Sequence, residues 1–332
     1  MNRGKSTALG DNELNIEELH ERRKNRFRVL VCIDGSDDSY LGLNYAADVA
    51  RGPNADIILL YVRPVDQGMR TGGLQVRMAR ENMLNWGLEL PGIQYLKKGR
   101  DRLIEDSDVN SEWGEEVTHT DVQGDPLGDN KIEYRHSSGK SIVLKLKVAP
   151  SVAVGILDQY ELGPYNLIII GGSGRWGGKA ISLWDPAVAE KVTVHAPCSV
   201  LVTRELQGGK GHLLCTDGSE RAMEMVRESA GLVKRTGAGH LSILSVALSG
   251  EGETEARANV DKAAELVRSL DVEPHEVFTR VGNPVEEIIK AGSEYSIIVV
   301  GDTGKTGIKR FFMGSVAFKV MEFANNSVMV VR

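Results

Sequence analysis

The sequence predicts an α/β protein made of two copies of one domain, each an open parallel sheet with helices on both faces. Two observations support this fold class. Four segments of the first half recur in the same order in the second half, and short apolar runs alternate with helical patterns. This alternation is typical of βαβ units, whose parallel strands are buried on both faces. A chain of 332 residues can bury two separate cores.

The duplication is visible as four pairs of similar segments. A fixed order of several matches identifies a repeated domain rather than a chance likeness. The pairs are residues 28–36 with 212–219, 56–62 with 240–246, 165–174 with 295–304, and 196–204 with 324–332. The division that follows is a polar N-terminal tail over 1–25, a first domain over 26–204, a linker over 205–211 and a second domain over 212–332.

The second copy shows its elements most clearly. Its helical stripes and strand-length apolar runs alternate from residue 212 to the end of the chain, and Asn283 followed by Pro284 is typical of a helix start. We expect strands over 212–215, 240–246, 296–300 and 327–331, and helices over 220–234, 255–270, from Pro284, and around Val316, Val320 and Phe323.

The first copy is longer than the second between its second strand and its third helix. We interpret residues 74–90 as an extra helix and residues 113–148 as including a polar hairpin around 136–139. The interval from Val62 to Pro150 is longer than the matching interval from Val246 to Pro284. A second alignment places Gly124-Asp125-Pro126 opposite Gly282-Asn283-Pro284, which moves the insertion behind the third strand, and both alignments remain open at this point.

Composition excludes several classes of function. A net charge of −6 argues against nucleic acid as the main partner, because binding the phosphate backbone requires a basic face. No stretch reaches the roughly 18 apolar residues of a membrane span, and the polar first 25 residues resemble neither a signal nor an anchor. We therefore expect a cytoplasmic protein without a membrane partner. The three cysteines and seven histidines lack metal-ligand spacing, so no metal site of the protein's own is predicted.

A pattern of glycines follows the strand expected over residues 296–300. Gly301 and Gly304 precede a basic stretch, and Gly314-Ser315 then opens a helical pattern. Such a loop offers backbone N–H groups and the positive end of a helix to a polyphosphate, and glycine permits close approach. Ser315 can add a hydroxyl donor. None of the Gly-Lys pairs in the chain fits the commoner Gly-x4-Gly-Lys-Ser/Thr phosphate loop.

The spacing Gly301-x2-Gly304-x9-Gly314-Ser315 resembles the ATP loop of the universal stress protein family. The Asp after the first strand, the Val at the end of the second and the final strand are also similar to that family, and the resemblance extends over both halves. It implies two tandem five-stranded parallel sheets of order 3-2-1-4-5, with ATP where the order reverses. Asp217 and Val246 would then hold the adenosine, and Gly301, Gly304, Gly314 and Ser315 would hold the phosphates with Mg²⁺.

The first copy departs from that pattern in the phosphate half of the site. Gly171 and Gly174 are retained, but Trp184-Asp185 replaces the Gly-Ser pair and Pro186 follows. Asp34 and Val62, which match Asp217 and Val246, are retained, so contacts with adenosine are possible in principle. The side chain of Asp185 at the cap of the next helix would use the N–H groups that a phosphate needs. We therefore predict one ATP per chain rather than two.

An ATP-binding regulatory or stress-response module is the function that these features favour. The alternative is a nucleotide-utilising enzyme of the same architecture, acting by adenylyl transfer or slow ATP hydrolysis, but the sequence shows no catalytic acid/base set. The predicted partners are ATP and a regulatory protein of unknown identity. The resemblance also implies an intrachain pseudo-dimer through residues 199–203 and 327–331, and it is compatible with a homodimer of the whole chain.

Overall fold

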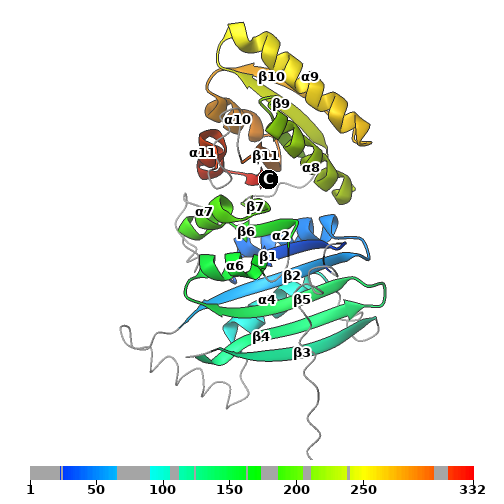
Figure 1. The fold of residues 1–332 in the computed structure, drawn as a ribbon, viewed down its shortest axis with the longest axis vertical. Coiled ribbons are helices and arrows are strands. Elements are labelled where there is room, and N and C mark those ends of the chain that lie inside the picture. The colour runs from blue at the N-terminus through cyan, green and yellow to red at the C-terminus, as the bar shows by residue number, and fades with distance from the viewer. Residues whose placement is uncertain are drawn as a thin grey trace, which may run out of the picture.

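The structure is a computed structural model that describes residues 23, 25–65, 90–104, 112–122, 125–161, 164–172, 186–204, 211–237, 240–302 and 313–332. The tail before residue 23, most of the helix expected over 74–90 and the linker residues 205–210 lie outside these ranges. One sheet of 12 strands extends along the long axis of the molecule, and helices lie against it (Figure 1).

The elements of the first half are β1 (Phe27–Cys32), α2 (Asp37–Val49), β2 (Ala55–Pro64), α4 (Pro91–Asp101), β3 (Trp113–Val122), β4 (Asp125–His136), β5 (Ser141–Ala149), α6 (Val152–Glu161), β6 (Leu167–Gly171), α7 (Pro186–His195) and β7 (Ser199–Thr203). Those of the second half are β8 (His212–Cys215), α8 (Glu220–Thr236), β9 (Leu241–Ala247), a 3₁₀ turn (Gly250–Gly252), α9 (Glu253–Ser269), β10 (Val277–Val281), α10 (Pro284–Gly292), β11 (Ile297–Gly301), α11 (Ser315–Phe323) and β12 (Ser327–Val331).

The strand order confirms the predicted fold class. In the second half the parallel order is β10-β9-β8-β11-β12, which is 3-2-1-4-5 in chain order. The first half repeats it as β5-β2-β1-β6-β7. The structure differs from two separate five-stranded sheets in two respects. The two sheets join edge to edge, and the first half carries β4 and β3 as antiparallel strands outside β5.

The position of β5 decides between the two alignments of the insertion. The third parallel strand of the first half is β5, which follows the inserted α4, β3 and β4, so the insertion precedes the third strand. The alignment of Gly124-Asp125-Pro126 with the start of the third helix is therefore wrong, because Asp125 begins β4. The polar hairpin around residues 136–139 is confirmed as the β4–β5 turn, where Gly139 has φ +94° and donates to the carbonyl of His136.

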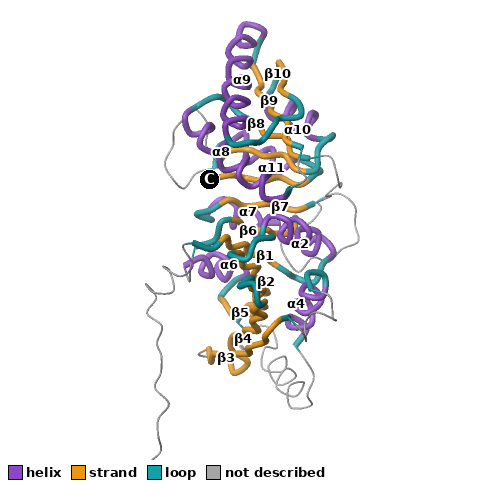
Figure 2. The backbone as a smooth tube through the Cα atoms, turned by 90° about the vertical axis from the view of Figure 1, so that its right-hand side faces the viewer, coloured by secondary structure: helices purple, strands orange, loops and turns teal. Residues whose placement is uncertain are grey.

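Two apolar layers lie on opposite faces of the sheet. Alternate strand residues point to opposite sides, so Val29 and Val31 of β1 join one layer while Leu30 and Cys32 join the other. The first layer receives buried side chains from α2, α4, α8 and α9, and the second from α6, α7, α10 and α11. In the first half, Figure 2 shows α2 and α4 on one side of the strands and α6 on the other. The sheet is therefore covered on both faces, as predicted.

The two halves meet through their last strands, as predicted. β7 pairs antiparallel with β12, with Leu201 opposite Met329. Two arginines extend this contact in a reciprocal way: Arg204 donates to the carbonyl of Met321 in α11 over 2.6 Å, and Arg332 donates to the carbonyls of Thr193 and Val194 in α7. Cations are favourable at helix C-termini, so each half stabilises the end of a helix in the other.

A second contact between the halves lies on the other face of the sheet. The imidazole Nε2 of His212 is 3.3 Å from the hydroxyl of Tyr45, and the guanidinium of Arg235 lies 4.0 Å from the ring centroid of Phe27. His212 is buried, and its Nδ1 has no hydrogen-bond partner among the residues that the structure describes. Burial lowers the pKa of His212 from 6.5 to about 4, because the interior disfavours the charged imidazolium.

Cleavage of the linker should leave the two halves associated, because the strand pairing and the arginine contacts do not depend on chain continuity. A protease site introduced within residues 205–210 allows cleavage under native conditions, and light scattering then gives the mass. We expect the mass of the intact chain. The double variant Arg204→Ala with Arg332→Ala should separate more readily after cleavage. Two free domains from the otherwise unchanged chain would show that the pairing is not stable.

His212 should make the stability of the protein sensitive to acid. In the unfolded chain His212 gains a proton as the pH falls through 6.5, whereas in the folded protein it stays neutral down to about pH 4. Its contribution is therefore fully present above pH 6.5 and is lost progressively toward pH 4, by about 3 kcal/mol in total. Denaturant unfolding of the wild type and of His212→Gln across this range measures the difference. An identical pH dependence in the two proteins would contradict the assignment.

Candidate nucleotide site

Five of the six predicted site residues lie at one edge of the sheet, and Gly304 lies outside the described residues. Asp217 follows β8, Val246 stands near the end of β9, Gly301 ends β11, and Gly314 with Ser315 begins α11. β8 pairs with β9 on one side and with β11 on the other. The strand order reverses beside β8, and such a switch point is where ligands bind in open α/β sheets.

Asp217 belongs to a tight turn that leads into α8. Its Oδ1 accepts a hydrogen bond from the N–H of Ser219 over 3.1 Å, and Asn259 of α9 donates to its backbone carbonyl over 3.0 Å. Gly218 has φ +74°, and a Cβ there would lie 1.9 Å from Oδ1 of Asn259. The turn therefore requires glycine, and it holds the half-exposed Asp217 at the edge of the sheet.

The start of α11 provides the arrangement expected for a phosphate. The N–H of Gly314 donates to the carbonyl of Asp302 over 2.5 Å, which places the start of α11 next to the end of β11. Gly314 caps α11 with φ −60° and ψ 146°, and no side chain in the described part of the chain caps this helix. Since its first N–H groups have no side-chain acceptor and Ser315 is exposed, this helix end can accept an anion.

Asp302 is a buried carboxylate that is not among the residues predicted from the sequence. Its oxygens lie 3.5 Å from Nε of Arg332 and 3.8 Å from Nε of Arg221. Burial lowers the pKa of Arg332, and the carboxylate of Asp302 opposes that shift. Because Arg332 also contacts α7 of the first half, Asp302 connects the start of α11 to the contact between the halves. One difference between the two copies could have indicated this residue: the position of Gly172 in the first copy is occupied by an acid, Asp302, in the second.

The corresponding edge of the first half is closed by packing. Asp34 is only 6% exposed and Val62 only 2%, whereas Asp217 and Val246 are both half-exposed. The ring of Tyr95 from the inserted α4 covers Gly35 so closely that a Cβ would lie 2.8 Å from it. The adenosine contacts that the sequence left available in the first copy are therefore buried. Trp184 and Asp185 lie outside the described residues.

The described residues contain no group of three or more histidine, cysteine or acidic side chains that could hold a metal ion. Burial raises the pKa of the Cys198 thiol to about 12, and it raises the pKa of Cys32 and Cys215 further, so these thiols stay protonated and unreactive at neutral pH. Among the helices of the described segments, none is long and apolar enough to cross a membrane.

The fold and this edge define a duplicated, doubly wound α/β protein with one accessible switch point. The model of the universal stress protein family matches residues 25–204 and again residues 212–332. The chain therefore belongs to the universal stress protein family.

Relatives and solved structures agree with this assignment. The universal stress protein MJ0531 of Methanocaldococcus jannaschii is 30% identical over 138 residues, which cover 35% of this chain and 78% of the relative. A universal stress protein structure from Archaeoglobus fulgidus has a TM-score of 0.50 at 18% identity and covers 92% of this chain and 96% of its own. A putative universal stress protein from Pseudomonas aeruginosa has a TM-score of 0.53 at 15% identity, with 94% of each chain covered. These two structures support the fold.

Proposed function

We propose that the second half of the chain binds ATP with Mg²⁺ and that the protein acts as a nucleotide-dependent regulatory module. The observation that carries this proposal is the difference between the two copies at the same sheet edge. The first copy buries Asp34 and Val62, whereas the second leaves Asp217, Val246 and the start of α11 accessible. A site that is closed in one copy and kept accessible in the other is consistent with a retained ligand.

Each residue of the site has a physical role in this proposal. Asp217 and Val246 hold the adenosine through a polar and an apolar contact. Gly301, Gly304 and Gly314 let the phosphates approach the backbone, and the N-terminus of α11 supplies positive potential. Ser315 is exposed at the first position of that helix and donates its hydroxyl. Mg²⁺ neutralises phosphate charge and keeps water among its ligands, as is usual for this ion.

The regulatory part of the proposal rests on Asp302. Its carbonyl accepts from Gly314 and its carboxylate faces Arg332, which contacts α7 of the first half. ATP bound at Gly301 and Gly314 fixes the separation of the end of β11 from the start of α11. Because Asp302 forms an ion pair with Arg332, this constraint also acts on the contact between the halves. A partner that binds both halves can then distinguish the nucleotide-bound protein from the nucleotide-free protein.

Replacing Gly314→Asp should strongly weaken ATP binding. The added carboxylate caps α11 and places negative charge where phosphate is favoured, so we expect affinity to fall by at least about tenfold. Calorimetric titration with ATP and Mg²⁺ measures this loss. Gly231→Asp is the matched control, because Gly231 is an exposed glycine of α8 with open space around its missing Cβ, and it should bind like the wild type. Unchanged affinity in Gly314→Asp would place the site elsewhere.

A further inference from the structure

β10 is the end strand of the sheet in the second half, and its outer edge carries no strand among the described residues. The N–H of Ile243 donates to the carbonyl of Glu276, and the N–H of Gly282 donates to the carbonyl of Ala247, so even-numbered residues of β10 direct their backbone groups to β9. Backbone direction alternates along a strand. The N–H and C=O groups of Val277, Thr279 and Val281 therefore point outward.

The first half shows what such an edge accepts. β5 occupies the position of β10, because each is the third parallel strand of its half. Its outer edge is covered by the antiparallel strand β4, with Ile132 opposite Leu144 and Asn130 opposite Leu146. The insertion that supplies β4 has no counterpart in the second half. The same architectural edge is thus paired in one copy and left unpaired in the other.

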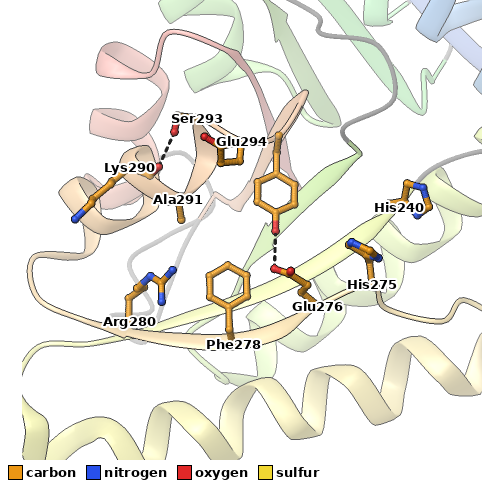
Figure 3. A pocket seen from close by; sticks show the side chains of 10 residues that line it. His240, His275, Glu276, Phe278, Arg280, Lys290, Ala291, Ser293 and Glu294 are labelled. Carbon is orange, nitrogen blue, oxygen red and sulfur yellow. Dashed lines mark hydrogen bonds between the residues drawn. The ribbon is translucent and has the colours of Figure 1, made fainter.

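A groove of about 710 Å³ lies beside the edge of β10, between this strand and the end of α10. Figure 3 shows Arg280 and Lys290 at one end of the groove, Phe278 in the middle, and His240 and His275 at the other end. The guanidinium of Arg280 lies 5.1 Å from the ring centroid of Phe278. Neither Arg280 nor Lys290 forms an ion pair with a described carboxylate. Glu276 and Glu294 also line the groove, so its charges balance as a whole, and the two cations lie together at one end of it (Figure 3).

The opposite end of the sheet is protected in a way that β10 is not. β3 presents exposed Glu115 and Glu116, and its register shifts between Thr120 and Val122. Acidic side chains and irregularities are common means of preventing an edge strand from pairing. The edge of β10 has one charged residue, Arg280, and a regular register with β9 over all five of its residues. Of the two ends of this sheet, β10 is the one suited to pairing.

We propose that the outer edge of β10 binds an extended acidic segment of a partner protein, which adds to the sheet as an antiparallel strand. The backbone of the segment pairs with Val277, Thr279 and Val281, as β4 pairs with β5. Acidic side chains near the N-terminus of the segment face the groove and meet Arg280 and Lys290, and the following uncharged part lies against Phe278 and passes Glu276. Backbone pairing supplies affinity in this mode of recognition, and side-chain pockets supply specificity. The interaction does not depend on bound nucleotide.

A labelled, terminally blocked heptapeptide of valine and threonine, with glutamate at the two groove-facing positions nearest its N-terminus, tests the proposal on the full chain by fluorescence anisotropy. We expect saturable binding, and we expect the same peptide with lysine in place of glutamate to bind at least about tenfold more weakly. Thr279→Pro should weaken binding, because it removes an outward N–H without touching the bonds to β9. Arg280→Glu combined with Lys290→Glu should weaken it as well. Lys262→Glu, an exposed charge reversal on α9, is the matched control and should have no effect.

Three results would overturn the proposal. Equal binding of the glutamate and lysine peptides would remove the charge recognition, and failure of the glutamate peptide to bind would remove the docking edge. A wild-type dimer that becomes monomeric in Thr279→Pro would show that a second copy of the chain occupies the edge instead. Thermal unfolding of each variant verifies that it is folded. The double charge reversal changes only exposed side chains, so it preserves the test if Thr279→Pro is unstable.

Discussion

The antiparallel pairing of β7 with β12 is the interaction on which the rest of the structure depends. An open parallel sheet leaves its last strand with unpaired backbone groups, and here each half covers the exposed edge of the other. The same pairing places Arg204 and Arg332 at the ends of helices in the opposite half. It also brings α2 of the first half against α8 of the second, and His212 at the start of β8 meets Tyr45 of α2. The two domains therefore form one continuous sheet.

Within this shared sheet the two copies have diverged in complementary ways. The insertion of the first copy supplies Tyr95, which covers Gly35, and β4, which covers the edge of β5. The second copy has neither feature, so both its switch point and its outer edge remain accessible. Closing one copy stabilises the molecule, because it buries apolar surface and pairs backbone groups. In the proposed function the other copy alone binds the nucleotide, and the ion pair of Asp302 with Arg332 connects its site to the contact with the first half.

The local patterns of the sequence were sufficient to predict most of the fold. Apolar runs and helical stripes located the strands and helices of the second half, and Asn283 does cap α10, accepting from the N–H of Val285 over 3.0 Å. The family resemblance supplied the strand order and the pairing of the last strands. It also supplied the site residues, and those within the described chain lie at one edge of the sheet.

Contacts between residues distant in sequence could not be predicted in this way. The position of Tyr95 over Gly35 depends on how the insertion folds back onto the turn after β1, and no local pattern reports that. The ion pair of Asp302 with Arg332 depends on the two halves meeting, as does the contact of His212 with Tyr45. The alignment of the insertion stayed open for the same reason, because only strand pairing identifies β5 as the third parallel strand.

The number of ATP molecules bound per chain tests the central claim most directly. Calorimetric titration of the full chain with ATP and Mg²⁺ gives this stoichiometry, and the variants Asp34→Ala and Asp217→Ala assign the site to one half. We predict one site, retained in Asp34→Ala and weakened in Asp217→Ala. Two equivalent sites, or a single site that is lost in Asp34→Ala and unchanged in Asp217→Ala, would contradict it.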